Sequence, residues 1–126
     1  MTTTRPRVLL ADDHPGMLKA LARLLSFDCD VVATVADGAE LVEAAARYQP
    51  AVVVVDMNLP RISGVDACRR IIKNDPWTKV IVISGISDEL IRQEAAAAGA
   101  AAFVSKLAAS NELVLAIKHA WTESGR

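Results

Sequence analysis

The side chains best suited to chemistry each come at or shortly after the end of a short apolar run. Asp12 and Asp13 follow the first run, Asp56 the third, Ser84 the fourth and Lys106 the fifth. Such continuous apolar runs are typical of strands buried on both faces of a parallel sheet. Because ligands bind at the carboxyl ends of the strands in such sheets, we expect these side chains to meet in one cleft.

Three carboxylates in one cleft predict a bound cation. Asp12, Asp13 and Asp56 would repel one another if all stayed ionised. Mg²⁺ prefers oxygen ligands and resolves this conflict, and Mn²⁺ could substitute for it. The metal would also offset the charge that develops on a transferred phosphoryl group. Asp56 is then a carboxylate nucleophile that can form an aspartyl phosphate. Ser84 and Lys106 can contact the phosphoryl oxygens.

Each of these residues also has an ordinary structural explanation. Asp13 alone could cap a helix, and Asp56 alone could begin a loop through an Asx turn. Ser84 alone would be a turn residue, and Lys106 a surface lysine. Their coincidence at one edge of the predicted sheet favours a shared site. His14 has no partner at metal-ligand spacing, so a role in helix entry is favoured over catalysis.

Amphipathic helical segments separate the five apolar runs. Alternating strands and helices predict a parallel sheet covered on both faces. We therefore expect an α/β, three-layer, doubly wound (βα)5 flavodoxin-like fold with a five-stranded parallel sheet of order 2-1-3-4-5. Gly99 can cap the fourth helix, and Ser110 or Asn111 the last one. The predicted strands are 8–11, 30–35, 51–55, 80–83 and 101–104.

The composition excludes several classes of function. The 126 residues are 52% hydrophobic and carry a formal net charge of −1, which is not the footprint of a nucleic-acid binder. No apolar run approaches the ~20 residues of a membrane span. Cys29 and Cys68 lack metal-binding spacing, and no signal-peptide pattern opens the chain, which indicates the cytoplasm. One domain, 1–126, is expected, with 1–5 and 123–126 as flexible ends.

Four stretches together resemble one known family. They are VLLADDHPGMLKALARLL, VVVVDMNLPRISGVDACRRI, VIVISG and AGAAAFVSK. The acidic pair, the D-x-N-x-P…G loop, the strand-ending Ser and the late Lys are similar in order and spacing to a two-component response-regulator receiver domain (CheY-like). LADDHP and DMNLP look most like the NarL/FixJ (LuxR-type) branch, whose members usually continue into a DNA-binding helix-turn-helix domain. Either a fragment of such a regulator or a stand-alone receiver fits these 126 residues.

The resemblance implies a role for each matching residue. Asp56 would be the phosphorylated residue, and Ser84 and Phe103 would form the switch pair. Phe103 could equally be an ordinary core aromatic. Lys106 would contact the phosphoryl group. The implied metal ligands are Asp12, Asp13, Asp56 and the backbone carbonyl of Asn58.

The resemblance also implies how the domain would signal. A sensor histidine kinase or a phosphotransfer protein would donate the phosphoryl group. The modification would switch the surface of the fourth helix, fifth strand and fifth helix, through which a homodimer could form. The domain would promote only its own phosphorylation and dephosphorylation, so it would not be an enzyme. Transcription would be controlled through an output domain that lies outside this chain.

Two residues depart from the family pattern. Leu107 follows Lys106 where receivers usually have proline, often after a cis bond. A cis bond before a non-proline residue costs about 3 kcal/mol, so we expect a trans peptide and an altered loop. Ile86 is apolar where many relatives are polar, and it could hinder the water that hydrolyses the aspartyl phosphate.

Three other functions fit the sequence less well than a receiver. An aspartate-dependent phosphatase generally needs a second acidic residue two positions after the nucleophile, where this chain has Asn58. A pseudo-receiver that acts through protein contacts alone is disfavoured by the complete acidic site, although Leu107 leaves room for it. A flavodoxin-like cofactor binder would need a Ser/Thr/Gly-rich phosphate loop after the first strand.

Overall fold

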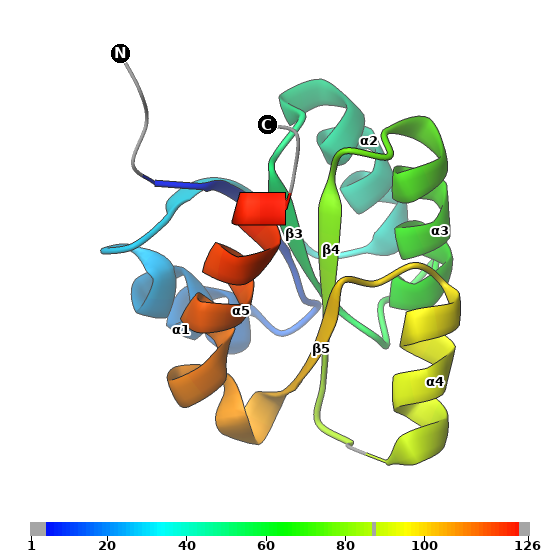
Figure 1. Cartoon of the computed structure of the whole chain (residues 1–126). Coiled ribbons are helices and arrows are strands. Elements are labelled where there is room, and N and C mark those ends of the chain that lie inside the picture. Colours follow the sequence, from blue (N-terminus) through cyan, green and yellow to red (C-terminus); the bar gives the residue numbers. More distant parts are fainter. Residues whose placement is uncertain (1–4, 87, 124–126) are drawn as a thin grey trace.

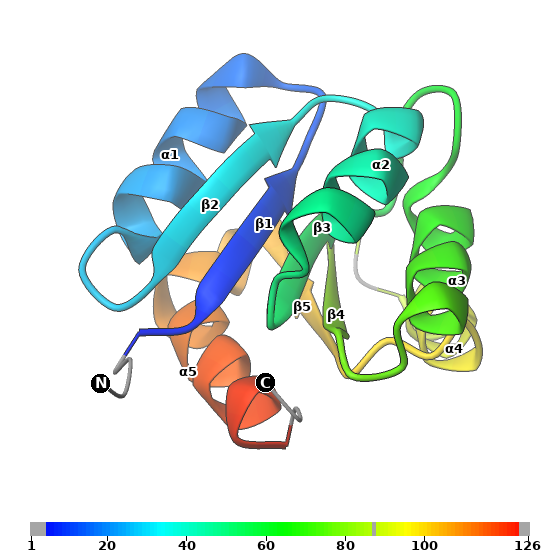
Figure 2. The same cartoon turned by 90° about the horizontal axis from the view of Figure 1, so that it is seen from above.

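Five parallel strands form the central sheet in the order β2-β1-β3-β4-β5, as predicted. The structure is a computed structural model and describes residues 5–86 and 88–123. Figures 1 and 2 show the sheet between two layers of helices. The strands are β1 (Arg7–Ala11), β2 (Asp30–Val35), β3 (Val52–Asp56), β4 (Lys79–Ser84) and β5 (Ala102–Ser105).

Five α-helices cover the two faces of the sheet. One face carries α1 and α5, and the other carries α2, α3 and α4 (Figure 1). In the described ranges, no helix is long and apolar enough to cross a membrane. The helices are α1 (Pro15–Leu25), α2 (Gly38–Tyr48), α3 (Gly64–Asn74), α4 (Glu89–Ala97) and α5 (Ala109–Glu123).

The strands divide the hydrophobic core into two clusters. Along β3, Val53 and Val55 pack with α2, α3 and α4, whereas Val52 and Val54 pack with α1 and α5. The residues of β3 alternate between the two clusters because successive side chains of a strand point to opposite faces of the sheet. All five residues of β3 are buried, which explains why this strand reads as an unbroken valine run.

Side-chain caps begin three of the helices where turn-forming residues stand in the sequence. Asp37 accepts a hydrogen bond from the backbone N–H of Glu40 at 2.8 Å, and Ser63 accepts one from Asp66 at 3.1 Å. Asp88 begins α4 in the same way. Each cap satisfies a backbone donor that the first turn of a helix leaves unpaired. The three caps lie in the loops that follow β2, β3 and β4.

The predicted cap of the last helix was wrong. A short 3₁₀ helix, η1 (Lys106–Ala108), leads directly into α5 at Ala109, so Ser110 and Asn111 lie inside the helix. Ser105 caps instead, because its Oγ accepts a hydrogen bond from the N–H of Leu107 at 3.2 Å. The cap therefore comes at the end of β5, five residues earlier than the first predicted position.

Of the expected flexible ends, 1–5 and 123–126, the structure describes Arg5 and Glu123 alone, and Glu123 is the last residue of α5. The guanidinium of Arg5 donates hydrogen bonds to the carbonyls of Ser26 and Cys29. These contacts hold the entry to β1 against the loop between α1 and β2.

Candidate functional site

Strand pairing brings the carboxyl ends of β1 and β3 together. Ala11 in β1 pairs with Val55 in β3, so Asp12 and Asp56 occupy neighbouring positions at the carboxyl edge. Asp12 is fully buried, and Asp56 is buried as the last residue of β3. Two carboxylates at this edge are what the predicted strand order required.

Lys106 connects these two carboxylates. Its Nζ lies 2.9 Å from Asp12 Oδ2 and 3.4 Å from Asp56 Oδ1. The lysine reaches them from the start of η1, directly after β5, with most of its side chain buried. The ammonium is therefore the counter-ion of two buried carboxylates.

Charge and burial act in opposite directions on this group. Burial raises the pKa of Asp56 above its ordinary value and Asp12 raises it further, whereas Lys106 lowers it. Burial lowers the pKa of Lys106, but hydrogen bonding and attraction to Asp12 and Asp56 outweigh burial, so its pKa is raised. The two carboxylates therefore stabilise the charged form of the lysine.

The two oxygens of Asp12 have different environments. Oδ1 accepts a hydrogen bond from the backbone N–H of His14 at 2.9 Å. Oδ2 is buried and lies 2.9 Å from the ammonium of Lys106. A buried carboxylate oxygen fits a cation site, because Mg²⁺ takes oxygen ligands.

Asp13 lies apart from this ion pair and beside His14. Its Oδ1 is 3.2 Å from His14 Nδ1, and the ligand atoms of Asp12, Asp13 and His14 lie within 4.8 Å of one another. Asp56 is not part of that group, so the described structure does not bring all three predicted metal carboxylates to one point. His14 begins α1 as expected, without a side-chain cap, but its ring also contacts the acidic pair. The sequence signal for this contact is the position of His14 directly after Asp13.

The loop after β3 is held tightly against the strand end. A Cβ on Gly64 would lie 2.2 Å from the backbone oxygen of Asp56, and Gly64 N donates to Met57 O at 2.9 Å. The backbone of Asn58 lies close enough to the Asp56 carboxylate to lower its pKa. The side chain of Asn58 is exposed. This loop therefore contributes backbone groups to the site.

Ser84 and Phe103 occupy the two strands beyond β3. Ser84 is buried at the end of β4, and its Oγ accepts a hydrogen bond from Ile86 N at 3.1 Å. Phe103 is partly buried in β5, and the guanidinium of Arg92 in α4 lies 4.8 Å from its ring centre. The stacking of Arg92 on Phe103 was not predicted from the sequence.

The loop that contains Leu107 keeps Lys106 within reach of the site. The described residues contain no cis peptide, so the bond between Lys106 and Leu107 is trans, as predicted. Leu107 is 91% exposed and Ile86 58% exposed, so both apolar side chains face outward at this edge. With Leu107 after it, Lys106 contacts both Asp12 and Asp56.

Comparison with known proteins gives a consistent family match. Residues 8–118 match the family model described as the response regulator receiver domain. The transcriptional regulatory protein DegU of Brevibacillus brevis is 32% identical over 114 residues, which cover 89% of this chain and 48% of DegU. The chain spans about half the length of the curated relatives it matches.

Solved structures show the same fold. The signal receiver domain of the response regulator NarL from Mycobacterium tuberculosis has a TM-score of 0.90 and 28% identity, with 98% of this chain and 100% of that chain covered. A two-component response regulator of the LuxR family from Aurantimonas sp. SI85-9A1 has a TM-score of 0.90 and 30% identity, with 95% and 87% covered.

Proposed function

The chain belongs to the response regulator receiver domain family of two-component systems, with relatives of the NarL/LuxR type, and we propose that Asp56 is its phosphoacceptor. The observation that supports this most directly is the contact of Lys106 with both Asp12 and Asp56 at the carboxyl edge of the sheet. In the proposal, residues 1–126 form one receiver domain.

Asp12, Asp13 and Asp56 would hold Mg²⁺, with the backbone carbonyl of Asn58 as a further ligand. When bound, Mg²⁺ supplies positive charge that offsets the charge on the phosphoryl oxygens. Two buried carboxylates at one edge, Asp12 and Asp56, support a cation here in addition to the Lys106 ammonium. Mn²⁺, which also accepts oxygen ligands, would substitute.

Asp56 performs the covalent step in this proposal. One of its carboxylate oxygens attacks the phosphorus atom, and the bond from phosphorus to the donor group breaks as the aspartyl phosphate forms. Lys106 then contacts the phosphoryl oxygens as a point charge. The Ser84 hydroxyl, which accepts a hydrogen bond from Ile86 N, can also donate one, and would donate to the phosphoryl group.

The donor would be a sensor histidine kinase or a phosphotransfer protein in the cytoplasm. The modified protein is itself the product, so the domain acts as a switch and does not turn over a diffusible substrate. Movement of Ser84 and Phe103 would change the α4–β5–α5 surface, where two copies would pair. The output would be control of transcription, as the name of DegU states for that protein.

The test is the intact mass of the chain after incubation with acetyl phosphate, with and without Mg²⁺. We expect a Mg²⁺-dependent gain of one phosphoryl group, and loss of that gain in Asp56→Ala. A Glu112→Gln variant, changed at an exposed acidic residue on α5, should gain it normally. No gain in the parent chain would contradict the proposal and favour a pseudo-receiver.

A further inference from the structure

The start of α2 is joined to the loop that follows Asp56. This loop, residues 57–63, connects β3 to α3. The backbone N–H of Gly38, the first residue of α2, donates to the carbonyl of Pro60 in the loop at 3.1 Å. A Cβ on Gly38 would lie 1.9 Å from the carbonyl oxygen of Ile62. The two backbones therefore approach each other as closely as only glycine allows.

A strained turn stands at this point of contact. Arg61 has φ 69°, in the left-handed region that favours glycine. The N–H of Ile62 donates to the carbonyl of Pro60 at 2.9 Å, which closes a three-residue turn of the rare, strained kind around Arg61. Such strain persists only where the surrounding structure holds it. The carbonyl that closes this turn is the one that also accepts the N–H of Gly38.

An ion pair spans the same contact. Asp37 Oδ1 accepts the backbone N–H of Glu40 and thereby caps α2, while Asp37 Oδ2 lies 3.6 Å from Arg61 Nε. The side chain of Asp37 is 16% exposed and that of Arg61 is 73% exposed. The cap gives the carboxylate a fixed position, and the arginine reaches over to it. One aspartate therefore both begins α2 and holds the strained residue of the loop.

The base of the loop is held by β3 instead. Gly64 N donates to Met57 O at 2.9 Å, and the side chains of Met57 and Leu59 are buried. Asn58 lies between this base and the contact with α2. Its backbone is close enough to Asp56 to lower the pKa of that carboxylate. A shift of the loop tip would therefore move the backbone of Asn58 relative to Asp56.

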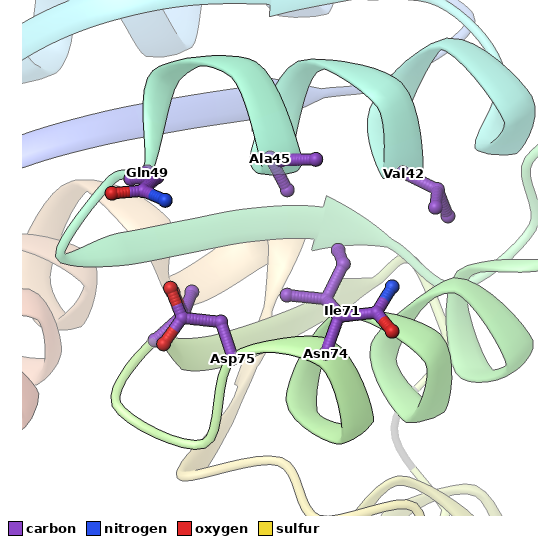
Figure 3. Close-up of a pocket in the computed structure, with 8 residues that line it drawn as sticks. Val42, Ala45, Gln49, Ile71, Asn74 and Asp75 are labelled. Carbon is purple, nitrogen blue, oxygen red and sulfur yellow. The ribbon is translucent and has the colours of Figure 1, made fainter.

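The helices that begin at these loops leave room between them at their far ends. A pocket of about 140 Å³ lies between the C-terminal halves of α2 and α3. Figure 3 shows Val42 and Ala45 on one wall and Ile71 on the other. The contact of Gly38 with the loop lies at the opposite ends of these helices, at the edge that carries Asp56.

We propose that Asp37, Gly38 and Arg61 are positioning residues for the cation site. They hold the tip of the loop between β3 and α3, and through it the backbone of Asn58, whose carbonyl is the proposed ligand of Mg²⁺. None of the three needs to touch the metal. The inference rests on the function proposed for Asp56 and adds to it the residues that set the affinity of the site for its cation.

Charge and position predict opposite effects at Arg61. Removal of a positive charge near a cation site should, by charge alone, strengthen Mg²⁺ binding. If Arg61 positions the loop, Arg61→Gln should instead weaken it by about two- to fivefold, as expected for loss of one exposed ion pair. Asp37→Asn should weaken binding by a similar factor and keep the cap, because Asn caps helices as well as Asp. The double variant should bind as the single variants do, because all three lack the same interaction.

Titration of Mg²⁺ into the ¹⁵N-labelled 126-residue chain at neutral pH measures these affinities through backbone amide shifts, with urea denaturation of each variant alongside. Asp66→Asn is the matched control. Asp66 belongs to another exposed ion pair, with Arg69 at 3.0 Å, and its replacement should leave the affinity unchanged. Arg61→Gly separates position from stability: glycine relieves the strained backbone, so stability should not fall while Mg²⁺ affinity does.

Each outcome decides a different point. Tighter Mg²⁺ binding by Arg61→Gln, or unchanged affinity in both single variants, would overturn the positioning role and leave the proposed phosphoacceptor site intact. Equal weakening by Asp66→Asn would reduce the effect to net charge and overturn it as well. A parent chain that binds no Mg²⁺ would overturn the proposed cation site, and this inference with it.

Discussion

Lys106 is the side chain that makes the buried carboxylates of this edge compatible with folding. Asp12 is 0% exposed, and an isolated carboxylate in such surroundings is strongly disfavoured. The ammonium at 2.9 Å offsets its charge, and the same ammonium lies 3.4 Å from Asp56. In the proposed function, Mg²⁺ would act on the same carboxylates as this lysine.

Replacement of Lys106 by Gln should make stability depend on Mg²⁺. Without metal, we expect the free energy of unfolding to fall by about 1–3 kcal/mol, because buried Asp12 loses its cation. Excess Mg²⁺ should restore part of this loss. Urea denaturation with and without Mg²⁺ measures both effects, and Lys19→Gln, an exposed lysine on α1, is the control. Equal metal-free stability of Lys106→Gln and the parent chain would contradict the counter-ion role.

Ile86 should lengthen the lifetime of the aspartyl phosphate. Its side chain is 58% exposed and follows Ser84 closely, at the edge where water must approach Asp56. We expect Ile86→Asn to shorten the half-life by a factor on the order of two to ten, at most about 1.4 kcal/mol in activation free energy. Loss of the phosphoryl mass over time measures it. Leu90→Asn, another exposed apolar residue, should leave the half-life unchanged. A half-life unaltered in Ile86→Asn would count against this role.

Which residues of the site come close together was predictable, but their detailed partners were not. The meeting of Asp12, Asp56 and Lys106 follows from strand order, because each comes at or just after a strand end. The contact of Asp13 with His14 and the stacking of Arg92 on Phe103 depend on rotamers. Several side-chain rotamers fit one strand-and-helix pattern, so these contacts needed the structure.

At the scale of elements, the loop from β3 to α3 depends on a glycine. Gly64→Ala should lower the free energy of unfolding by about 1–3 kcal/mol, because the new Cβ meets the backbone oxygen of Asp56 at 2.2 Å. It should also slow phosphorylation by displacing the strand end. Gly16→Ala in α1 is the control: it meets nothing within 4 Å and should stabilise by about 0.4–1 kcal/mol. Denaturation and phosphorylation rates check both, and a neutral Gly64→Ala would show that the loop can shift freely.

Elements with strong periodic patterns were predictable, and those that depend on one local hydrogen bond were not. Continuous apolar runs identified the strands, and their alternation with amphipathic helices indicated the parallel sheet. The predicted start of the last helix was wrong because Ser110 and Asn111 are also good capping residues. Ser105 prevails because β5 passes directly into η1, which leaves no loop for a later cap.

At the scale of the whole molecule, two buried thiols give stability a dependence on alkaline pH. Burial raises the pKa of Cys29 and that of Cys68 from 9.0 to about 11. Between these values the unfolded chain ionises its thiols while the folded chain keeps them protonated. Stability present below about pH 9 is therefore lost as pH rises toward 11, by up to about 1.4 kcal/mol per pH unit for each thiol.

Urea denaturation at a series of pH values measures this slope. The double variant Cys29→Ala, Cys68→Ala should lose stability less steeply over the same range than the parent chain does. Each single variant should lie between them. Identical slopes in the parent and double variant would show that other groups, such as lysines and tyrosine, account for the whole dependence.

The same two cysteines lie on opposite sides of the sheet. Cys29 packs with α1 and α5, and Cys68 packs with α2, α3 and α4. A thiol-trapping reagent in dilute denaturant therefore reports separately how often each layer opens. Equal trapping rates mean that both layers open as one cooperative unit. Faster trapping at Cys68 means that the layer containing α4 loosens first, without global unfolding. The native chain thus contains its own pair of probes for the cooperativity of its two cores.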